Sequence, residues 1–229
     1  MKIGALQKIS LIDYPGKLCA IVFTQGCNFR CPYCHNPELV DPGLYDECQS
    51  EDAVFAFLEK RKGKLDAVSI TGGEPTIQKN VITFIEHIKN SGYSVKIDTN
   101  GSNPKIIKNI IDRELIDYIA MDVKGPLRKY KALTKSQVDE DKIQQSMSLI
   151  MASGIPYEFR TTVLKSQLDK NDILEIGKLI KNASLYVLQN FVASKTLDEC
   201  YVHELTYSRE ELEYLKEKLL EDIHSVKIR

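Results

Sequence analysis

Short apolar segments rich in β-forming residues alternate along this chain with segments in which apolar residues recur at helical spacing. The first pair consists of Leu18–Thr24 (LCAIVFT), which predicts a buried strand, and Glu51–Lys60 (EDAVFAFLEK), which predicts a helix. The same patterns predict strands at Leu65–Thr71, Ser94–Asp98, Ile116–Asp122, Tyr157–Val163 and Leu185–Gln189, and helices at Ile77–Lys89, Asn103–Ile111, Val138–Met151, Asp169–Lys181 and Ser208–Leu220. Such alternation indicates an α/β fold in which right-handed crossovers join parallel strands.

About six strand–helix units suit either a partial, open barrel or a doubly wound sheet, and both bind ligands at the carboxyl ends of their strands. The 229 residues contain no internal repeat, no low-complexity tract and no linker rich in Pro, Gly or Ser. We therefore expect one domain over residues 1–229, with a core at about 15–192 and a helical extension at about 193–229.

The charge balance and the cysteine content exclude several classes of protein. Thirty-one Lys and Arg residues oppose 32 Asp and Glu residues, so nothing in the net charge of -1 favours a dedicated nucleic-acid binder. No apolar run is long enough for a membrane span, and the first residues lack the apolar core of a signal peptide, which predicts a soluble, cytoplasmic protein. Six cysteines are too few for a disulfide scaffold.

Three of the cysteines lie close together in the segment after the first predicted strand. Cys27, Cys31 and Cys34 have the spacing C-x3-C-x2-C. Three thiolates on one loop can hold three corners of a cubane [4Fe–4S] cluster, and the fourth iron then stays open to a small molecule. Two alternatives are a structural zinc site with His35 as a strained fourth ligand, and buried thiols that are close by coincidence.

Polar motifs also end the later strands. Thr71-Gly72-Gly73-Glu74-Pro75 follows the second predicted strand, Asp98-Thr99-Asn100-Gly101 the third and Met121-Asp122-Val123-Lys124-Gly125 the fourth, while Arg160 lies within the fifth. Parallel strands would bring these motifs to one mouth. The simpler alternatives are a plain strand-to-helix turn at Pro75, helix capping by Asp98 and Asp122, and a solvent-facing Arg160.

The cysteine motif, with the aromatic Tyr33 before its last cysteine, resembles that of the radical S-adenosylmethionine (SAM) enzymes. The wider stretch YPGKLCAIVFTQGCNFRCPYCHNPELV resembles the activases of glycyl radical enzymes, and most of all the long form of the anaerobic ribonucleoside-triphosphate reductase activating proteins. The likeness extends from about Leu6 to Phe191. It implies a partial (β/α)6 barrel of the radical SAM type that binds a [4Fe–4S] cluster and SAM.

The resemblance also implies roles for individual residues. It implies that Cys27, Cys31 and Cys34 bind the cluster. The residues that it implies for cofactor binding are Tyr33, His35, Asn36, Gly72, Gly73, Glu74, Asp98, Thr99, Asn100, Asp122, Lys124 and Arg160. A monovalent cation would take Asp98, Thr99, Asp122 and the carbonyl of Met121 as ligands. Asp13 of SLIDYPGK is a candidate substrate contact, with a turn before Pro15 as its alternative.

The function implied is reductive cleavage of SAM to generate a glycyl radical on a partner, which we expect to be an anaerobic ribonucleotide reductase. Flavodoxin or ferredoxin is the expected electron donor. The segment Leu188-Gln189-Asn190-Phe191 departs from pyruvate formate-lyase activases, which carry a leucine-proline-tyrosine-histidine type segment there. The alternatives are another activase, an enzyme like 7-carboxy-7-deazaguanine synthase, or an iron–sulfur electron-transfer module. Cys48 and Cys200 have no spacing typical of a second cluster.

Overall fold

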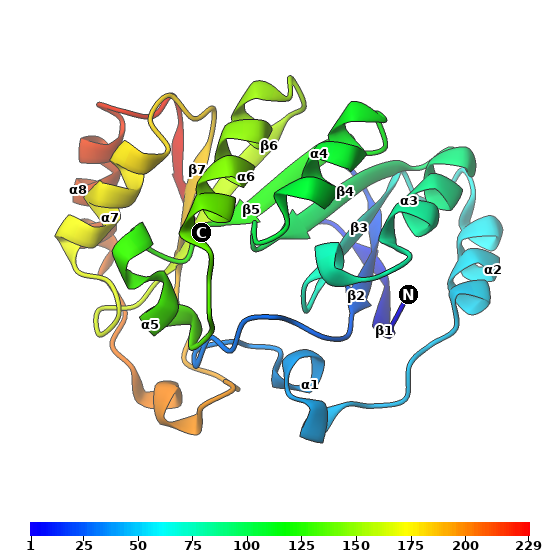
Figure 1. Ribbon diagram of the computed structural model, residues 1–229, viewed down its shortest axis with the longest axis horizontal. Helices are drawn as coiled ribbons and strands as arrows, with labels where there is room; N and C mark the ends of the chain where they lie inside the picture. The colour runs from blue at the N-terminus through cyan, green and yellow to red at the C-terminus, as the bar shows by residue number, and fades with distance from the viewer.

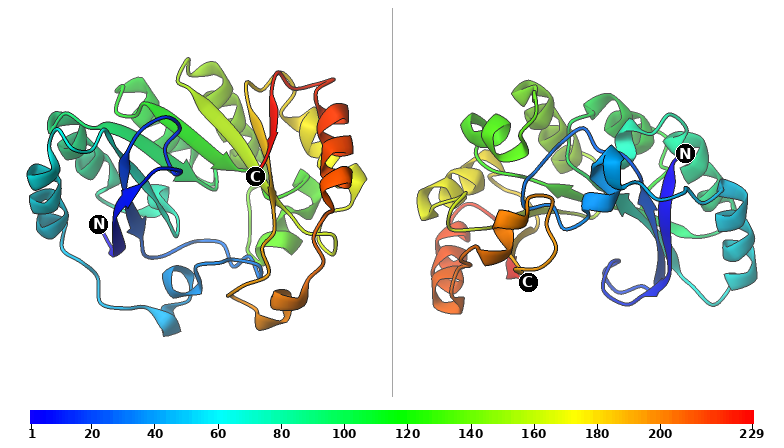
Figure 2. Two further views of the ribbon diagram at one scale, coloured as in Figure 1. Left: turned by 180° about the vertical axis from the view of Figure 1, so that it is seen from behind. Right: turned by 90° about the horizontal axis from the view of Figure 1, so that it is seen from below.

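All eight strands of the protein form one sheet in which their order in space follows their order in sequence. The computed structural model describes every residue from Met1 to Arg229. The strands are β1 (Ile3–Ser10), β2 (Cys19–Thr24), β3 (Ala67–Gly72), β4 (Ser94–Thr99), β5 (Tyr118–Asp122), β6 (Tyr157–Val163), β7 (Tyr186–Asn190) and β8 (Val226–Ile228). Strands β2 to β8 are parallel to their neighbours, and β1 pairs antiparallel with β2. The sheet is curved and open, which confirms the partial barrel (Figures 1 and 2).

The longer helices cross over between successive parallel strands and lie along the outer face of the curved sheet, whereas the two shortest lie in the connections that follow β2 and β5 (Figures 1 and 2). They are α1 (Pro37–Val40), α2 (Glu51–Arg61), α3 (Val81–Asn90), α4 (Pro104–Asp112), α5 (Tyr130–Thr134), α6 (Glu140–Ala152), α7 (Lys170–Leu179) and α8 (Arg209–Leu219). Ser50 caps α2, and Ser208 forms a capping box with Glu211 at the start of α8. No helix has both the length and the apolar character that crossing a membrane would need.

The sequence patterns do not predict two of the eight strands, β1 and β8. In β1 (IGALQKIS) the residues are mostly polar or half-buried, because this strand lies at the edge of the sheet. Strand β8 has three residues, too few to show a period. The segment predicted as a helical extension therefore contains a seventh parallel strand as well as α8, and the expected number of about six strands is too low.

The two faces of the sheet differ in chemistry. On the outer face, Ile70, Ile97 and Phe159 are buried in a large apolar core that includes the helices. Because side chains alternate along a strand, the inner face carries their neighbours, among which Lys96 and Glu158 are buried and polar. Apolar burial against the helices thus stabilises the sheet, while a polar interior opens toward the carboxyl ends of the strands.

Candidate active site

A cavity of about 270 Å³ lies at the carboxyl ends of the parallel strands. It is lined by 20 residues, and the 15 residues predicted to bind the cluster or the cofactor are all among them. The other five are Phe29, Val40, Thr71, Thr162 and Gln189. Segments from six different parts of the sequence meet here because the parallel strands all end at the same edge.

The cysteine loop is anchored by backbone hydrogen bonds to three separate segments. Gly26 N donates to Leu39 O at 2.8 Å, and Arg30 N donates to Thr134 O, at the end of α5, at 2.7 Å. Leu197 N, in the segment after β7, donates to the carbonyl of Cys34 at 2.9 Å. The surrounding fold therefore fixes the position of the loop.

The three cysteines of this loop are free thiols whose pKa values are raised by burial. Cys27, Cys31 and Cys34 form no disulfide. Burial raises the pKa of Cys27 to about 12 and that of Cys31 to about 11. Thiols with such pKa values stay protonated at neutral pH unless a metal centre replaces the proton.

The geometry of His35 argues against the zinc alternative. Its Nε2 is hydrogen-bonded to the carbonyl of Val192 at 2.9 Å, and its ring stacks on Phe191 with 5.1 Å between ring centroids. No three His, Cys, Asp or Glu side chains are grouped around the position of a single metal ion. A cubane is wider than one ion, and three thiols without a fourth protein ligand fit a [4Fe–4S] cluster with one open iron.

Close contact with the cysteine loop explains the paired glycines after β3. Gly72 has φ +106°, and a Cβ atom on it would lie 2.5 Å from Thr24 N. A Cβ atom on Gly73 would lie 2.1 Å from the carbonyl oxygen of Gly26, directly before Cys27. The paired glycines therefore let two strand ends pack backbone to backbone.

Glu74 joins the loop after β3 to the loop after β4. It is 1% exposed and accepts hydrogen bonds from Thr76 N at 3.0 Å, Thr99 Oγ1 at 2.8 Å and Asn100 N at 2.7 Å. Burial raises the pKa of Glu74, and these hydrogen bonds act in the opposite direction. Pro75 begins a short 3-10 helix, so the segment is both a turn and part of the cavity wall.

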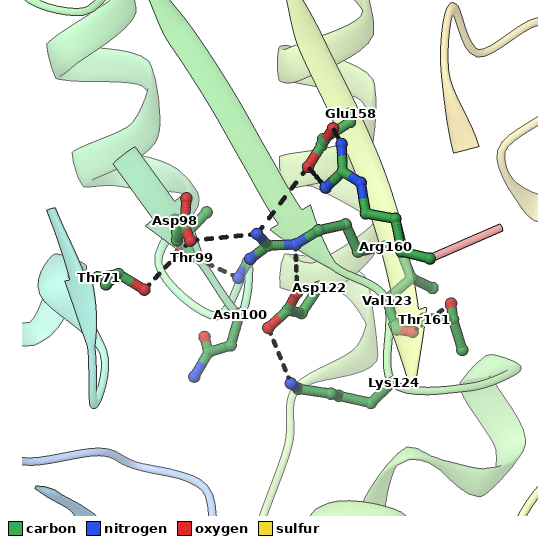
Figure 3. Close-up of polar contacts among 12 residues, drawn as sticks. Thr71, Asp98, Thr99, Asn100, Asp122, Val123, Lys124, Glu158, Arg160 and Thr161 are labelled. Carbon is green, nitrogen blue, oxygen red and sulfur yellow. Dashed lines mark hydrogen bonds and ion pairs between the residues drawn. The ribbon is translucent and has the colours of Figure 1, made fainter. Parts of the chain in front are cut away.

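An ion-pair network links three neighbouring strands at the inner end of the cavity (Figure 3). Arg160 donates to Asp122 Oδ1 at 2.9 Å and to Asp98 Oδ2 at 3.2 Å. Lys124 Nζ donates to Asp122 Oδ2 at 3.1 Å, and Lys96 pairs with Asp98. Burial by itself would raise the pKa of both carboxyls, but the cationic neighbours lower it further than burial raises it. The network is therefore ionised at neutral pH.

Two of the simpler alternatives are wrong. The side chain of Arg160 is only 13% exposed, so it does not face solvent. Neither Asp98 nor Asp122 caps a helix: α4 has Asn103 at its N-cap, and the short helix after β5 has Pro126 there. Both carboxylates are instead committed to the charged network.

The arrangement of charges gives little support to the predicted monovalent cation. Asp98 and Asp122 already neighbour three cationic side chains, and the Thr99 hydroxyl donates to Glu74. Met121 does not line the cavity. Asp98 and Asp122 thus already have cationic partners within the protein, and the monovalent cation stays a prediction.

Asp13 lies at the end of the sheet opposite to the cavity. Because β1 is antiparallel to β2, the residues between them connect Ser10 to its partner Cys19, at the amino end of β2. There Asp13 accepts a hydrogen bond from the Ser10 hydroxyl. Asp13 therefore does not line the cavity, and its contact with substrate stays a prediction, as does its alternative role in a turn.

Sequence reasoning missed two buried charges of the inner face. Lys96 is 2% exposed and precedes Asp98 by two residues on β4. Glu158 is 1% exposed and precedes Arg160 by two residues on β6. Side chains two apart in a strand share a face, so this spacing from a candidate site residue was an available signal.

Comparison with known proteins shows the family of the chain. The chain matches the Radical SAM superfamily over residues 21–180. A Methanocaldococcus jannaschii protein provisionally named glycyl-radical enzyme activating enzyme MJ1227 is 38% identical over 205 residues, which cover 86% of this chain and 82% of the relative. The pyruvate formate-lyase-activating enzyme of Listeria monocytogenes is 34% identical over 148 residues, covering 59% of this chain and 58% of that enzyme.

The chain is also similar to an enzyme with a different named activity, and its fold is similar to that of a distant solved structure. The 7-carboxy-7-deazaguanine synthase of Thermococcus kodakarensis is 26% identical over 187 residues, covering 72% of this chain and 70% of that enzyme. The crystal structure of SuiB from Streptococcus suis superposes with a TM-score of 0.70 at 15% identity, covering 91% of this chain and 48% of SuiB. With a curated relative at 38% identity and the superfamily match over most of the chain, the protein belongs to the radical SAM superfamily and, within it, to the glycyl-radical enzyme activating enzymes.

Proposed function

We propose that the partner of this activase is an anaerobic ribonucleoside-triphosphate reductase, on which it generates a glycyl radical. The observation that supports radical chemistry at this site is a single cavity with three cysteine thiols on one wall and paired carboxylates with an arginine on another. The partner is inferred from the sequence: β7 ends in Gln189-Asn190, without the histidine of the formate-lyase activases that the chain also resembles.

The thiolates of Cys27, Cys31 and Cys34 would hold three irons of a [4Fe–4S] cluster and leave the fourth for the methionyl amine and carboxylate of SAM. The cluster and SAM, when bound, supply the one-electron chemistry that yields a 5′-deoxyadenosyl radical, which removes a hydrogen atom from a glycine Cα. The chain itself provides orientation and a buried environment, and no side chain has to act as a general base.

The charged network supplies recognition in this proposal. SAM carries an ammonium, a sulfonium and a carboxylate, so it needs anionic and cationic partners side by side. Asp98 and Asp122 present negative charge to the cationic groups, and Arg160 presents a planar cation that suits a carboxylate. Because Glu74 holds the loops after β3 and β4 together, these groups keep their positions when the ligand enters.

Electron paramagnetic resonance (EPR) spectroscopy tests the proposal directly. The cluster is reconstituted anaerobically, and reductant, SAM and the candidate reductase are added before the spectrum is recorded. We expect a glycyl-radical doublet on the reductase with a matching amount of 5′-deoxyadenosine, and neither signal with Cys31→Ala. Reduced flavodoxin or ferredoxin in place of the chemical reductant tests the expected electron donor.

The remaining outcomes distinguish the alternatives. 5′-Deoxyadenosine without a doublet would show that the partner is wrong, and formate lyase or a deazaguanine precursor would then be tried in its place. If neither product forms although the cluster is intact and reducible, the activase proposal fails and an electron-transfer module becomes the better explanation.

A further inference from the structure

A buried carboxylate lies beside the charged network but does not line the cavity. Glu158 lies on the inner face of β6, and its Oε2 accepts a hydrogen bond from the Tyr118 hydroxyl at 3.2 Å. Arg229, which directly follows β8, binds both carboxylate oxygens, with Nη1 2.9 Å from Oε1 and Nη2 2.8 Å from Oε2. Two parallel N–H···O bonds of this kind are charge-assisted and roughly twice as strong as hydrogen bonds between neutral groups.

Arg160 therefore has carboxylates on more than one side, but it does not bind them equally. Figure 3 shows Arg160 between Glu158 and the pair formed by Asp98 and Asp122. Its hydrogen bonds to that pair are 2.9 and 3.2 Å long, whereas its Nη1 is 3.9 Å from Glu158 Oε1, too far for a hydrogen bond. The guanidinium is thus directed toward the cavity and away from Glu158.

We propose that Arg229 is a positioning residue for the SAM site and that it acts through Glu158. By binding both oxygens of Glu158, Arg229 leaves Arg160 directed to Asp98 and Asp122. Without the charge of Arg229, Glu158 would be a buried carboxylate with one hydroxyl partner, and an unpaired buried charge is strongly unfavourable. The nearest remaining cation is Arg160, which would turn toward Glu158 and away from the cavity. The inference rests on the proposed contact between Arg160 and SAM.

The backbone of β8 fixes Arg229 in this place. Arg229 N donates to Leu188 O at 2.9 Å, and Asn190 N donates to Arg229 O at 2.9 Å, so Arg229 continues the parallel pairing between β7 and β8. From there its side chain extends across β7 to β6. The short strand β8 thus has a role beyond covering the edge of the sheet.

A set of charge variants in the anaerobically reconstituted protein tests the inference, with the dissociation constant of SAM measured by isothermal titration calorimetry. Arg229→Met should weaken SAM binding about tenfold or more, which is what the loss of one charge-assisted contact predicts. Glu158→Gln and the double variant should stay within about threefold of wild type, because no carboxylate remains to attract Arg160. Arg113→Met is the matched control: Arg113 is a comparably exposed arginine that pairs with Glu86 away from the cavity.

The asymmetry of the two single variants separates positioning from simple stabilisation. Both variants lose the same ion pair, so a purely structural role would weaken SAM binding by both alike. The inference is overturned if Arg229→Met binds SAM as wild type does, or if the double variant is as weak as Arg229→Met. Should Arg229→Met not fold, Arg229→Lys keeps the charge and must retain most of the affinity. Failure of the wild-type holoenzyme to bind SAM would instead refute the proposed function itself.

Discussion

Replacing Gly73 by alanine places a methyl group against the backbone that leads into the cysteine loop. The added Cβ atom would lie 2.1 Å from Gly26 O and 2.7 Å from Gly26 C, whereas ordinary contact begins at 3.4 Å. The two backbones must therefore separate by about 1.3 Å. The hydrogen bond from Glu74 N to Gly26 O, now 2.8 Å long, cannot survive this separation.

The cost of this substitution can be worked from its two parts. Overpacking in a fixed environment costs about 1–3 kcal/mol, and the lost hydrogen bond adds about 1 kcal/mol. A total of roughly 3 kcal/mol corresponds to a fall of about 6–12 °C in the melting temperature of a chain of this size. Since Gly26 directly precedes Cys27, we also expect the variant to bind fewer than four irons per chain after reconstitution.

Urea unfolding followed by circular dichroism, together with iron content after anaerobic reconstitution, measures both effects. Gly43→Ala is the control, because a Cβ atom there meets nothing closer than Asp41 Oδ1 at 3.4 Å; its stability should change by less than about 1 kcal/mol. If the free energy of unfolding of Gly73→Ala lay within about 0.5 kcal/mol of wild type and the variant bound a full cluster, the close backbone packing at Gly73 would not be needed for stability or for cluster binding.

Three further predictions concern the charges and the cluster. The pKa values of Asp98 and Asp122 are lowered in the folded state, so the stability that these carboxylates contribute is fully present above their unfolded pKa of about 3.9 and is lost as the pH falls through their folded values. Urea unfolding between about pH 2 and pH 6 should show this loss, and Asp122→Asn should reduce it. Lys96→Met removes one of the two cationic partners of Asp98 and leaves Arg160 as the other, so it should destabilise the protein by about 2–3 kcal/mol at pH 7. An unchanged urea midpoint would show that the ion pair between Lys96 and Asp98 does not stabilise the fold. Cys31→Ala should unfold like wild type without the cluster but lose its [4Fe–4S] absorbance, and a full iron content would show that Cys31 is no ligand.

Much of the fold could be predicted because its signals are local. Apolar runs such as Leu18–Thr24 and helical patterns such as Glu51–Lys60 correspond to β2 and α2 within a few residues. The helix expected from Ile77 begins at Val81 instead, since Pro75–Ile77 forms a separate 3-10 helix. Strand β8 could not be predicted, because three residues carry no period and the strand is defined only by its pairing with β7.

Most residues that line the cavity could also be predicted from the sequence, because they lie at strand ends. Once alternation fixes parallel strands, every motif at a strand end must arrive at the same edge, which brings Cys27, Glu74 and Asp122 to one cavity. The same reasoning does not apply to Asp13, which follows β1. Because β1 is antiparallel to β2, the loop after β1 lies at the opposite end of the sheet from the loops after the parallel strands. A single strand direction therefore decided whether a candidate residue belonged to the site.

The sequence by itself determined the order of the elements, the ends of most strands and the residues that gather at the cavity, since each depends on spacing along a short stretch of chain. Only the tertiary structure decided which charges pair across the sheet: Arg160 with Asp98 and Asp122, and Glu158 with a residue 71 positions away. Ion pairing depends on distances across the sheet between residues far apart in sequence, and no periodicity records those distances.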